Sequence, residues 1–175
     1  MGKEKPFQPV KLFCGVIYRQ QSDLERMKWL LQEHLSAIDL ESPEIPFDCT
    51  DYYSQEMDSP LFRGFLSFEK LISPEELPGI KLLTNYIEDD ASIEGRRIVN
   101  IDPGYLSAAN VIIATTKNHF HRVPLAKGIY AHMEYVIVRK KVTPLEWTYP
   151  DFKKPPYIDF FTELGALYKN NLKNL

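Results

Sequence analysis

Short β-rich apolar runs and helical repeats alternate along this sequence, and their order restricts the folds it can adopt. Residues 11–19 (KLFCGVIYR) are apolar and rich in β-formers, which predicts a buried strand. Apolar side chains then recur at helical spacing from Leu24 to Ile38, and Ser22 with Glu25 three residues later matches a capping box. We therefore predict a helix that begins at Ser22 and ends near Ile38.

A second helix with strands on both sides follows. Residues 61–72 alternate as expected for a strand with at least one apolar face. The segment Ser73-Pro74-Glu75-Glu76 has the cap, the proline and the acid of a helix start, and the helix should run to about Asp89. Residues 96–104 then read as a strand that ends in a Pro103-Gly104 turn.

The rest of the chain adds further strands, an irregular arm and a last helix. We predict a strand over 110–117, for which a short helix is the alternative, a long strand over 128–142 and a C-terminal helix from about Pro156. Residues 47–53 (FDCTDYY) are a further short strand or the ordered part of a loop. Counted as a strand, they give the first six elements the β-α-β-β-α-β order of a ferredoxin-like unit. The predicted class is α+β: a mainly antiparallel sheet with helices on one face, extra strands and the C-terminal helix. Other α+β topologies fit the same order.

Length and charge limit the classes of protein. A chain of 175 residues is most simply a single domain, 1–175. A net charge of −3 gives no general attraction to nucleic acid. No apolar run reaches the roughly 18 residues of a membrane span, and the start has no secretory pattern. Cys14 and Cys49 form no metal motif and suit a reducing cytoplasm. We expect a cytoplasmic protein without nucleic-acid or membrane partners.

Several motifs together resemble one family. The segments FDCTDYY, RRIVNIDPGYLS, ATTK, HRVPLAKGIYA and EWTYPDF are similar to those of an uncharacterised prokaryotic family of domains of unknown function. Some of its members are automatically labelled "GTP-binding protein", and the resemblance implies no established activity or cofactor. No stretch here fits the G-x-x-x-x-G-K-[ST] phosphate loop, so classical GTPase chemistry is not expected. A non-classical nucleotide pocket stays open.

Asn100 and Asp102 form the first candidate site. In a strand over 96–102 they share one face, opposite Val99 and Ile101. Asp102 could simply begin the Pro-Gly turn and bond backbone amides there. Alternatively, its carboxylate is aimed into a cleft as an acid–base group or a metal ligand.

Lys117, His121 and Arg122 form the second candidate site. Arginine offers a rigid fork of donors for phosphate or carboxylate, and histidine exchanges protons near neutral pH. Together they could surround an anion. The alternative is that Arg122 pairs with Asp48 or Asp51 and ties the sheet to the aromatic loop.

Three histidines suggest a metal alternative. His121 or His119 could lie across a hairpin from His132, and two or three imidazoles with Asp102 or Glu134 would offer ligands to a divalent ion. That arrangement would suit a metal-dependent hydrolase.

Two aromatic segments complete the candidates. Asp48 and Asp51 lie in a loop rich in acids and tyrosines, where functional residues often occur, or they cap a turn. Trp147 and Tyr149 either bury the proline-rich arm or form an aromatic wall for a flat ligand.

These candidates converge on one hypothesis, a polar pocket for a small anionic ligand that is nucleotide-like or phosphorylated. If the protein is an enzyme, Asp102 or His121 would be the acid–base group. The expected binding residues share polar side chains and are Asp48, Asp51, Asn100, Lys117, Arg122 and Tyr130. The competing hypothesis is a non-catalytic module in which the same residues form an ion-pair network.

Overall fold

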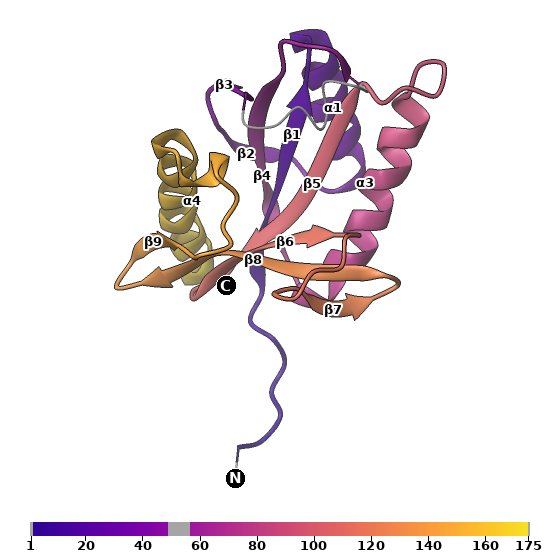
Figure 1. The fold of residues 1–175 in the computed structure, drawn as a ribbon. Coiled ribbons are helices and arrows are strands. Elements are labelled where there is room, and N and C mark those ends of the chain that lie inside the picture. The colour runs from indigo at the N-terminus through magenta and orange to yellow at the C-terminus, as the bar shows by residue number, and fades with distance from the viewer. Residues whose placement is uncertain (1, 49–56, 175) are drawn as a thin grey trace.

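The computed structural model describes residues 2–48 and 57–174 and shows an α+β fold built on one antiparallel sheet (Figure 1). The described part contains nine strands: β1 (Val10–Tyr18), β2 (Ile38–Glu41), β3 (Ile45–Pro46), β4 (Phe62–Ile72), β5 (Val99–Leu106), β6 (Asn110–Thr115), β7 (Val123–Ala126), β8 (Ile129–Val138) and β9 (Lys141–Pro144). Its α-helices are α1 (Gln21–His34), α3 (Leu77–Ala91) and α4 (Pro155–Lys173). None of these helices is long and apolar enough to span a membrane.

The first half of the chain forms the centre of the sheet. Its strands lie in the order β2-β4-β1-β5, and each neighbouring pair is antiparallel. α1 connects β1 to β2, and α3 connects β4 to β5, while the short β3 adds to the edge of β4. This order of helices and strands agrees with the sequence prediction, but β2 and β3 precede the segment 47–53 that was considered for a strand, of which 49–53 lie outside the described residues. The assignment to a ferredoxin-like unit stays a prediction.

The second half extends the sheet beyond β5 in the order β6-β8-β7. The long strand predicted over 128–142 is divided in two. Arg139 and Lys140 adopt left-handed backbone conformations, with φ of 48° and 68°, and turn the chain back so that β9 pairs with β8. The sequence did not predict this turn, because a left-handed conformation is usually indicated by a glycine and neither residue is one.

Helices cover both faces of the sheet and not one face as predicted, and β1 is accordingly apolar on both sides. Leu12, Cys14 and Val16 belong to the core under α1 and α3. Phe13 points the other way and meets Phe161 of α4, with ring centroids 4.9 Å apart. α3 and α4 accordingly lie on opposite sides of the sheet in Figure 1.

The two predicted helix starts have different outcomes. At the second one, Ser73 N–H donates to Glu76 Oε1 at 2.8 Å, as predicted. At the first one, α1 begins one residue before Ser22, and Gln20 is its N-cap residue. α1 also ends at His34, because Ile38 belongs to β2 and pairs with β4.

The predicted Pro103-Gly104 turn is wrong, because β5 continues through both residues to Leu106. Ile101 directs its N–H away from β1, and Pro103, two residues on, lacks an N–H at that same edge. Position 104 requires a glycine, because there is no room for a Cβ atom. A Cβ there would lie 2.3 Å from the carbonyl oxygen of Ile112 and 2.5 Å from the ring of Phe13.

One edge of β5 is only half paired. β5 pairs with β1 along its whole length, but it pairs with β6 only from Gly104 to Leu106. Residues 99–103 therefore present an edge that β6 does not cover, and α3 packs beside it. This edge positions the site described below.

We predict that Gly104→Ala destabilises the fold by about 1–3 kcal/mol, because the added methyl group overlaps backbone atoms. Gly79→Ala is the matched control. Gly79 lies in α3 with no atom within 4 Å of a Cβ, so alanine there should stabilise by about 0.5–1 kcal/mol. Urea denaturation measures both changes, and equal effects at the two positions would contradict the prediction.

Candidate functional site

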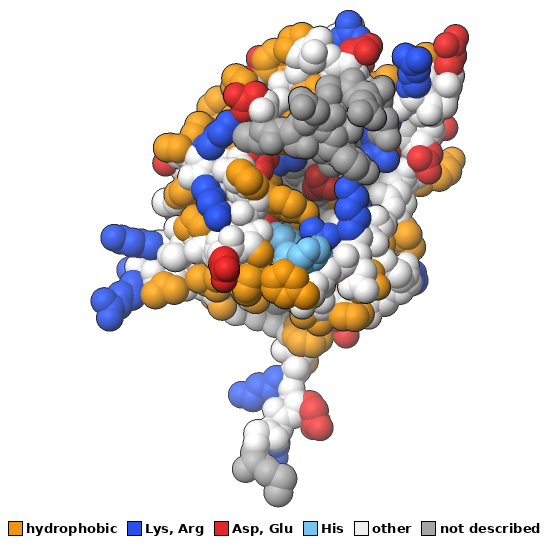
Figure 2. All heavy atoms as spheres, in the orientation of Figure 1, with side chains coloured by type: hydrophobic (Ala, Val, Ile, Leu, Met, Phe, Trp, Pro, Cys, Tyr) orange, Lys and Arg blue, Asp and Glu red, His pale blue; other side chains and the backbone are white. Residues whose placement is uncertain are grey.

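A cavity of about 580 Å³ opens beside the uncovered edge of β5. Its walls come from α3, β5, the end of β6 with the following loop, and the arm that precedes α4. Figure 2 shows the hollow, with Lys, Arg, Asp and Glu side chains inside it and histidines at its rim. The volume lies within the range of small-molecule sites.

Two oppositely charged side chains of α3 complete the open edge of β5. Lys81 Nζ donates a hydrogen bond to the carbonyl of Ile101 at 2.7 Å, and Ile101 N–H donates to Glu88 Oε1 at 2.8 Å. Both side chains are more than nine-tenths buried. They occupy backbone groups that would otherwise be left without partners in the protein interior, which would be costly.

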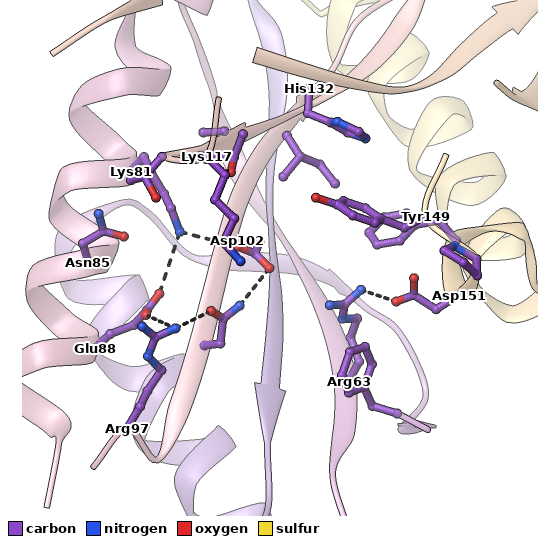
Figure 3. Close-up of a pocket in the computed structure, with 18 of the residues that line it drawn as sticks. Arg63, Lys81, Asn85, Glu88, Arg97, Asp102, Lys117, His132, Tyr149 and Asp151 are labelled. Carbon is purple, nitrogen blue, oxygen red and sulfur yellow. Dashed lines mark hydrogen bonds and ion pairs between the residues drawn. The ribbon is translucent and has the colours of Figure 1, made fainter. Parts of the chain in front are cut away.

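These side chains belong to a closed ring of polar contacts (Figure 3). Lys81 Nζ lies 3.5 Å from Asp102 Oδ1, and Asn100 Nδ2 donates to Asp102 Oδ2 at 2.8 Å. Arg97 Nη1 donates to Asn100 Oδ1 at 2.9 Å and lies 3.6 Å from Glu88 Oε2. Lys81 and Glu88 are 3.8 Å apart and close the ring. Each polar side chain is thereby oriented by its neighbours.

The two carboxylates of the ring differ in environment. Burial raises the pKa of Glu88 to about 7, although Lys81 and the amide of Ile101 act in the opposite direction. The side chain of Glu88 is 6% exposed, whereas that of Asp102 is 31% exposed. Glu88 can therefore exchange a proton near neutral pH, and Asp102 is the ring carboxylate that a ligand can reach.

A buried ion pair holds the opposite wall. Arg63 of β4 donates to Asp151 at 2.6 Å, and its guanidinium lies over the rings of Phe47 and Phe152 at 4.6 and 5.2 Å from their centroids. Both partners of the pair are 7% exposed. This contact fixes the arm before α4 against the sheet and so shapes the cavity.

Arg122 organises a third wall from behind. Its Nη1 donates to the backbone carbonyl of Lys117 at 2.7 Å, and its Nη2 donates to the hydroxyl of Tyr149 at 2.5 Å. Its Nε donates to His132 Nδ1 at 3.3 Å. All three donor nitrogens of the guanidinium are thus directed at protein atoms. Arg122 therefore positions Lys117 and Tyr149, both of which line the cavity.

Tyr149 presents a hydroxyl to the cavity. Its oxygen accepts from Arg122, which leaves the hydroxyl proton for another partner. Burial raises the pKa of Tyr149, so the phenol keeps that proton at neutral pH. The ring stacks on His132, with centroids 4.9 Å apart, and the backbone N–H donates to Glu134. Tyr149 is held in place from three directions.

The histidines form a chain. His132 Nε2 lies 2.5 Å from Glu134 Oε2, so we assign its proton to Nε2, and Nδ1 then accepts. His132 Nδ1 accepts from Arg122 Nε at 3.3 Å and lies 3.1 Å from His121 Nε2, while His121 Nδ1 lies 3.0 Å from His119 Nδ1. Burial, His132, His119 and Arg122 lower the pKa of His121, which favours this neutral pattern.

This chain does not provide a metal site. His121 directs one ring nitrogen to His119 and the other to His132, so the three imidazoles do not converge on one point. Within residues 2–48 and 57–174, no three ligating side chains are arranged to hold an ion. The metal-dependent alternative therefore has no ligand set in the described part of the chain.

The predicted site residues fall into four groups. Asn100, Asp102 and Lys117 line the cavity, and Asp102 lies inside β5 rather than at a turn. His121 and Arg122 lie one layer behind its wall. Tyr130 lies on β8 opposite Thr115 and is not among the described lining residues.

The fourth group is the aromatic loop. Asp48 is exposed and pairs with Lys154 at 2.7 Å, so the suggested Arg122–Asp48 pair is wrong. Asp48 is not among the lining residues either. Asp51 lies outside the described residues.

Sequence patterns missed Lys81, Glu88 and Arg63 and identified only part of the role of Tyr149. Lys81 and Glu88 lie seven positions apart on α3 with Asn85 between them, which is a polar stripe at helical spacing that could have been noticed. Arg63 gave no such signal, because it lies in a largely apolar strand. Tyr149 was weighed only as an aromatic surface, whereas the structure gives its hydroxyl a defined position.

The comparisons with known proteins agree with the resemblance seen in the sequence. A family model described as "Domain of unknown function (DUF4416)" matches residues 8–168. The chain therefore belongs to this family, whose description carries no activity. Neither a curated protein nor a solved structure matches the chain.

We predict that Glu88 makes the stability of the fold depend on pH. The folded-state pKa is raised from 4.5 to about 7, so the folded state binds this proton more tightly than the unfolded state. Stability should therefore fall as pH rises from about 4.5 to about 7, by an amount on the order of 3 kcal/mol at 1.36 kcal/mol per pKa unit. Above this window the contribution should level off.

The measurement is urea denaturation of wild type and Glu88→Gln between pH 4.5 and pH 8. The glutamine keeps an oxygen for Ile101 N–H, so the stability difference between the proteins should change across the window. Glu163→Gln, at an exposed position of α4, should follow the wild type at every pH. A difference between wild type and Glu88→Gln that is constant with pH would refute the assignment.

Proposed function

We propose that the cavity binds a small anionic ligand, and that this ligand is phosphorylated or nucleotide-like. The observation that carries the proposal is that Arg122 donates hydrogen bonds to two residues of the cavity wall. One guanidinium holds the backbone of Lys117 and the hydroxyl of Tyr149, two residues 32 positions apart in sequence, on the wall of a single cavity. An ammonium and a hydroxyl donor on the wall of one cavity suit phosphate or carboxylate oxygens.

The other polar groups support an oriented ligand. Thr115 and Thr116 line the cavity next to Lys117 and add hydroxyl groups. The positive side chains Arg63, Lys81 and Arg97 are accompanied by Asp151, Asp102 and Glu88. The cavity is therefore a mixed polar site and not a uniformly basic funnel, and the proposed anion would lie where Lys117 and Tyr149 line its wall.

Glu88 supports an enzymatic version of this function. A buried carboxyl with a pKa near 7 at a cavity wall has the property of a general acid or base. The sequence suggested His121 for this role, but both ring nitrogens of His121 face other imidazoles. In the enzymatic version Glu88 therefore replaces His121 as the proton-exchanging group, with Asp102 beside it.

The competing hypothesis is a structural network. The closed ring favours it, because ion pairs that complete the open edge of β5 need no ligand to explain them. The ring consists of Lys81, Asp102, Asn100, Arg97 and Glu88. The two hypotheses differ in their consequences at Lys117 and Tyr149, which are outside the ring.

We also propose a cytoplasmic location, which Cys14 supports as a buried free thiol.

The binding proposal predicts a thermal shift. Inorganic phosphate, nucleoside phosphates, sugar phosphates and dicarboxylates would be screened, and at least one should raise the melting temperature by mass action. Tyr149→Phe and Lys117→Ala should each weaken that ligand roughly 10-fold or more, since a hydrogen bond to a charged group contributes about 1.5–3 kcal/mol. Isothermal titration of the responding ligand measures the loss.

Lys169→Ala is the matched control, because Lys169 is exposed on α4 away from the cavity lining. It should bind as the wild type does. A panel without any stabilising ligand, or equal binding by Lys117→Ala and Lys169→Ala, would favour the structural network instead.

A further inference from the structure

The ligand class can be narrowed further by the carboxylate of Asp102, on the condition that the proposed anion site exists. We propose that the ligand carries a hydrogen-bond donor, a hydroxyl or an ammonium group, as well as its anionic group, and that Asp102 accepts from this donor. The cavity would then distinguish hydroxylated or aminated small acids from plain alkyl anions.

Asp102 retains capacity to accept. A carboxylate offers about four acceptor positions on its two oxygens. Asp102 Oδ2 accepts from Asn100 at 2.8 Å, and Lys81 Nζ approaches Oδ1 only to 3.5 Å, the outer limit of a hydrogen bond. With 31% of its side chain exposed and a place in the cavity wall, Asp102 can accept from a molecule in the cavity.

The two buried carboxylates of the lining are different. Glu88 is 6% exposed and accepts from the amide of Ile101. Asp151 is 7% exposed and accepts from Arg63 at 2.6 Å. These two complete the fold from within, whereas Asp102 faces the space where a ligand would lie.

The ring of polar contacts fixes the orientation of the Asp102 carboxylate and leaves acceptor positions on its oxygens. Arg97 donates to the amide oxygen of Asn100, which fixes the amide so that its nitrogen points at Asp102. Asn100 is 4% exposed and so has little freedom to turn. The carboxylate is thus pre-oriented before a ligand arrives, which lowers the cost of binding.

Asp102 and Tyr149 belong to the same binding space. Both line the cavity, and the charge of Asp102 contributes to the raised pKa of Tyr149, after burial as the main cause. Figure 3 shows the Tyr149 hydroxyl directed into the space that Asp102 also borders. A ligand that spans the space meets donors at Tyr149 and Lys117 and an acceptor at Asp102.

The physical basis of selectivity is the cost of an unpaired carboxylate. A ligand without a donor would displace water from Asp102 and would not replace the hydrogen bond that the water donated to the carboxylate. Sites built around a hydroxyl or amino group reject analogues that lack it more strongly than apolar pockets reject a missing methyl group. The donor should therefore decide affinity as well as orientation.

The experiment compares matched phosphate esters by isothermal titration. Glycerol 3-phosphate and n-propyl phosphate differ by their hydroxyls, and phosphoethanolamine and ethyl phosphate differ by the ammonium group. Wild type should bind at least one donor-bearing member roughly 10-fold or more tightly than its partner, the size of one hydrogen bond to a charged group. The pair that responds distinguishes a hydroxyl from an ammonium ligand.

Asp102→Asn should reduce that preference to less than about threefold, because it loses one acceptor oxygen and its charge. Asp89→Asn is the control, since Asp89 is an exposed acid that also lines the cavity, and it should keep the preference.

The outcomes separate the two proposals. Equal binding within both wild-type pairs would overturn the role of Asp102 and leave the anion site standing. No binding of any of the four esters would overturn the role of Asp102, and together with a thermal-shift panel without any stabilising ligand it would overturn the anion site as well. An unchanged preference in Asp102→Asn would overturn Asp102 as the acceptor. If that variant does not fold, the wild-type pairs still decide.

Discussion

The uncovered edge of β5 is the constraint on which the rest of the site depends. β6 leaves β5 at Gly104, so the backbone N–H and carbonyl of Ile101 lack a neighbouring strand. Lys81 and Glu88 reach across from α3 and supply an ammonium donor and a carboxylate acceptor in its place. Completing a strand with charged side chains forces those charges to be buried together, because neither could be buried alone.

The chemistry of the cavity follows from this burial. Once Lys81 and Glu88 are fixed, Arg97 and Asn100 complete the hydrogen bonds of the ring and Asp102 is held at the cavity wall. The same burial moves the pKa of Glu88 toward neutrality. A feature that satisfies the backbone thereby also produces an oriented carboxylate and a proton-exchanging group, and the structural and ligand-binding hypotheses share these residues.

The opposite side of the cavity is organised by the arm before α4. Tyr149 and Asp151 come from a proline-rich segment that periodicity cannot describe. Their positions depend on Arg122 and Arg63, which lie 27 and 88 residues earlier in the sequence. The cavity thus lies between the incomplete edge of β5 and the irregular arm before α4. Each of these walls depends on contacts between segments that are distant in the sequence.

Local patterns were informative where neighbours within a few residues decided the outcome. The Ser73 capping box and the strand character of β1 and β8 could be predicted, because each depends on neighbours within a few residues. Pro103-Gly104 was misread as a turn, because the same two residues also suit a strand edge without a donor and a close approach of Phe13. Composition alone does not separate these uses.

The amino-acid sequence by itself determined the α+β class, the order of the elements and the shared face of Asn100 and Asp102, since alternation and helical spacing report which side of each element is buried. Only the tertiary structure decided that α3 completes β5, that Arg122 contacts Tyr149 and Lys117, and that both ring nitrogens of His121 face other histidines. Contacts between distant segments depend on how the whole chain packs, and local periodicity carries no record of that.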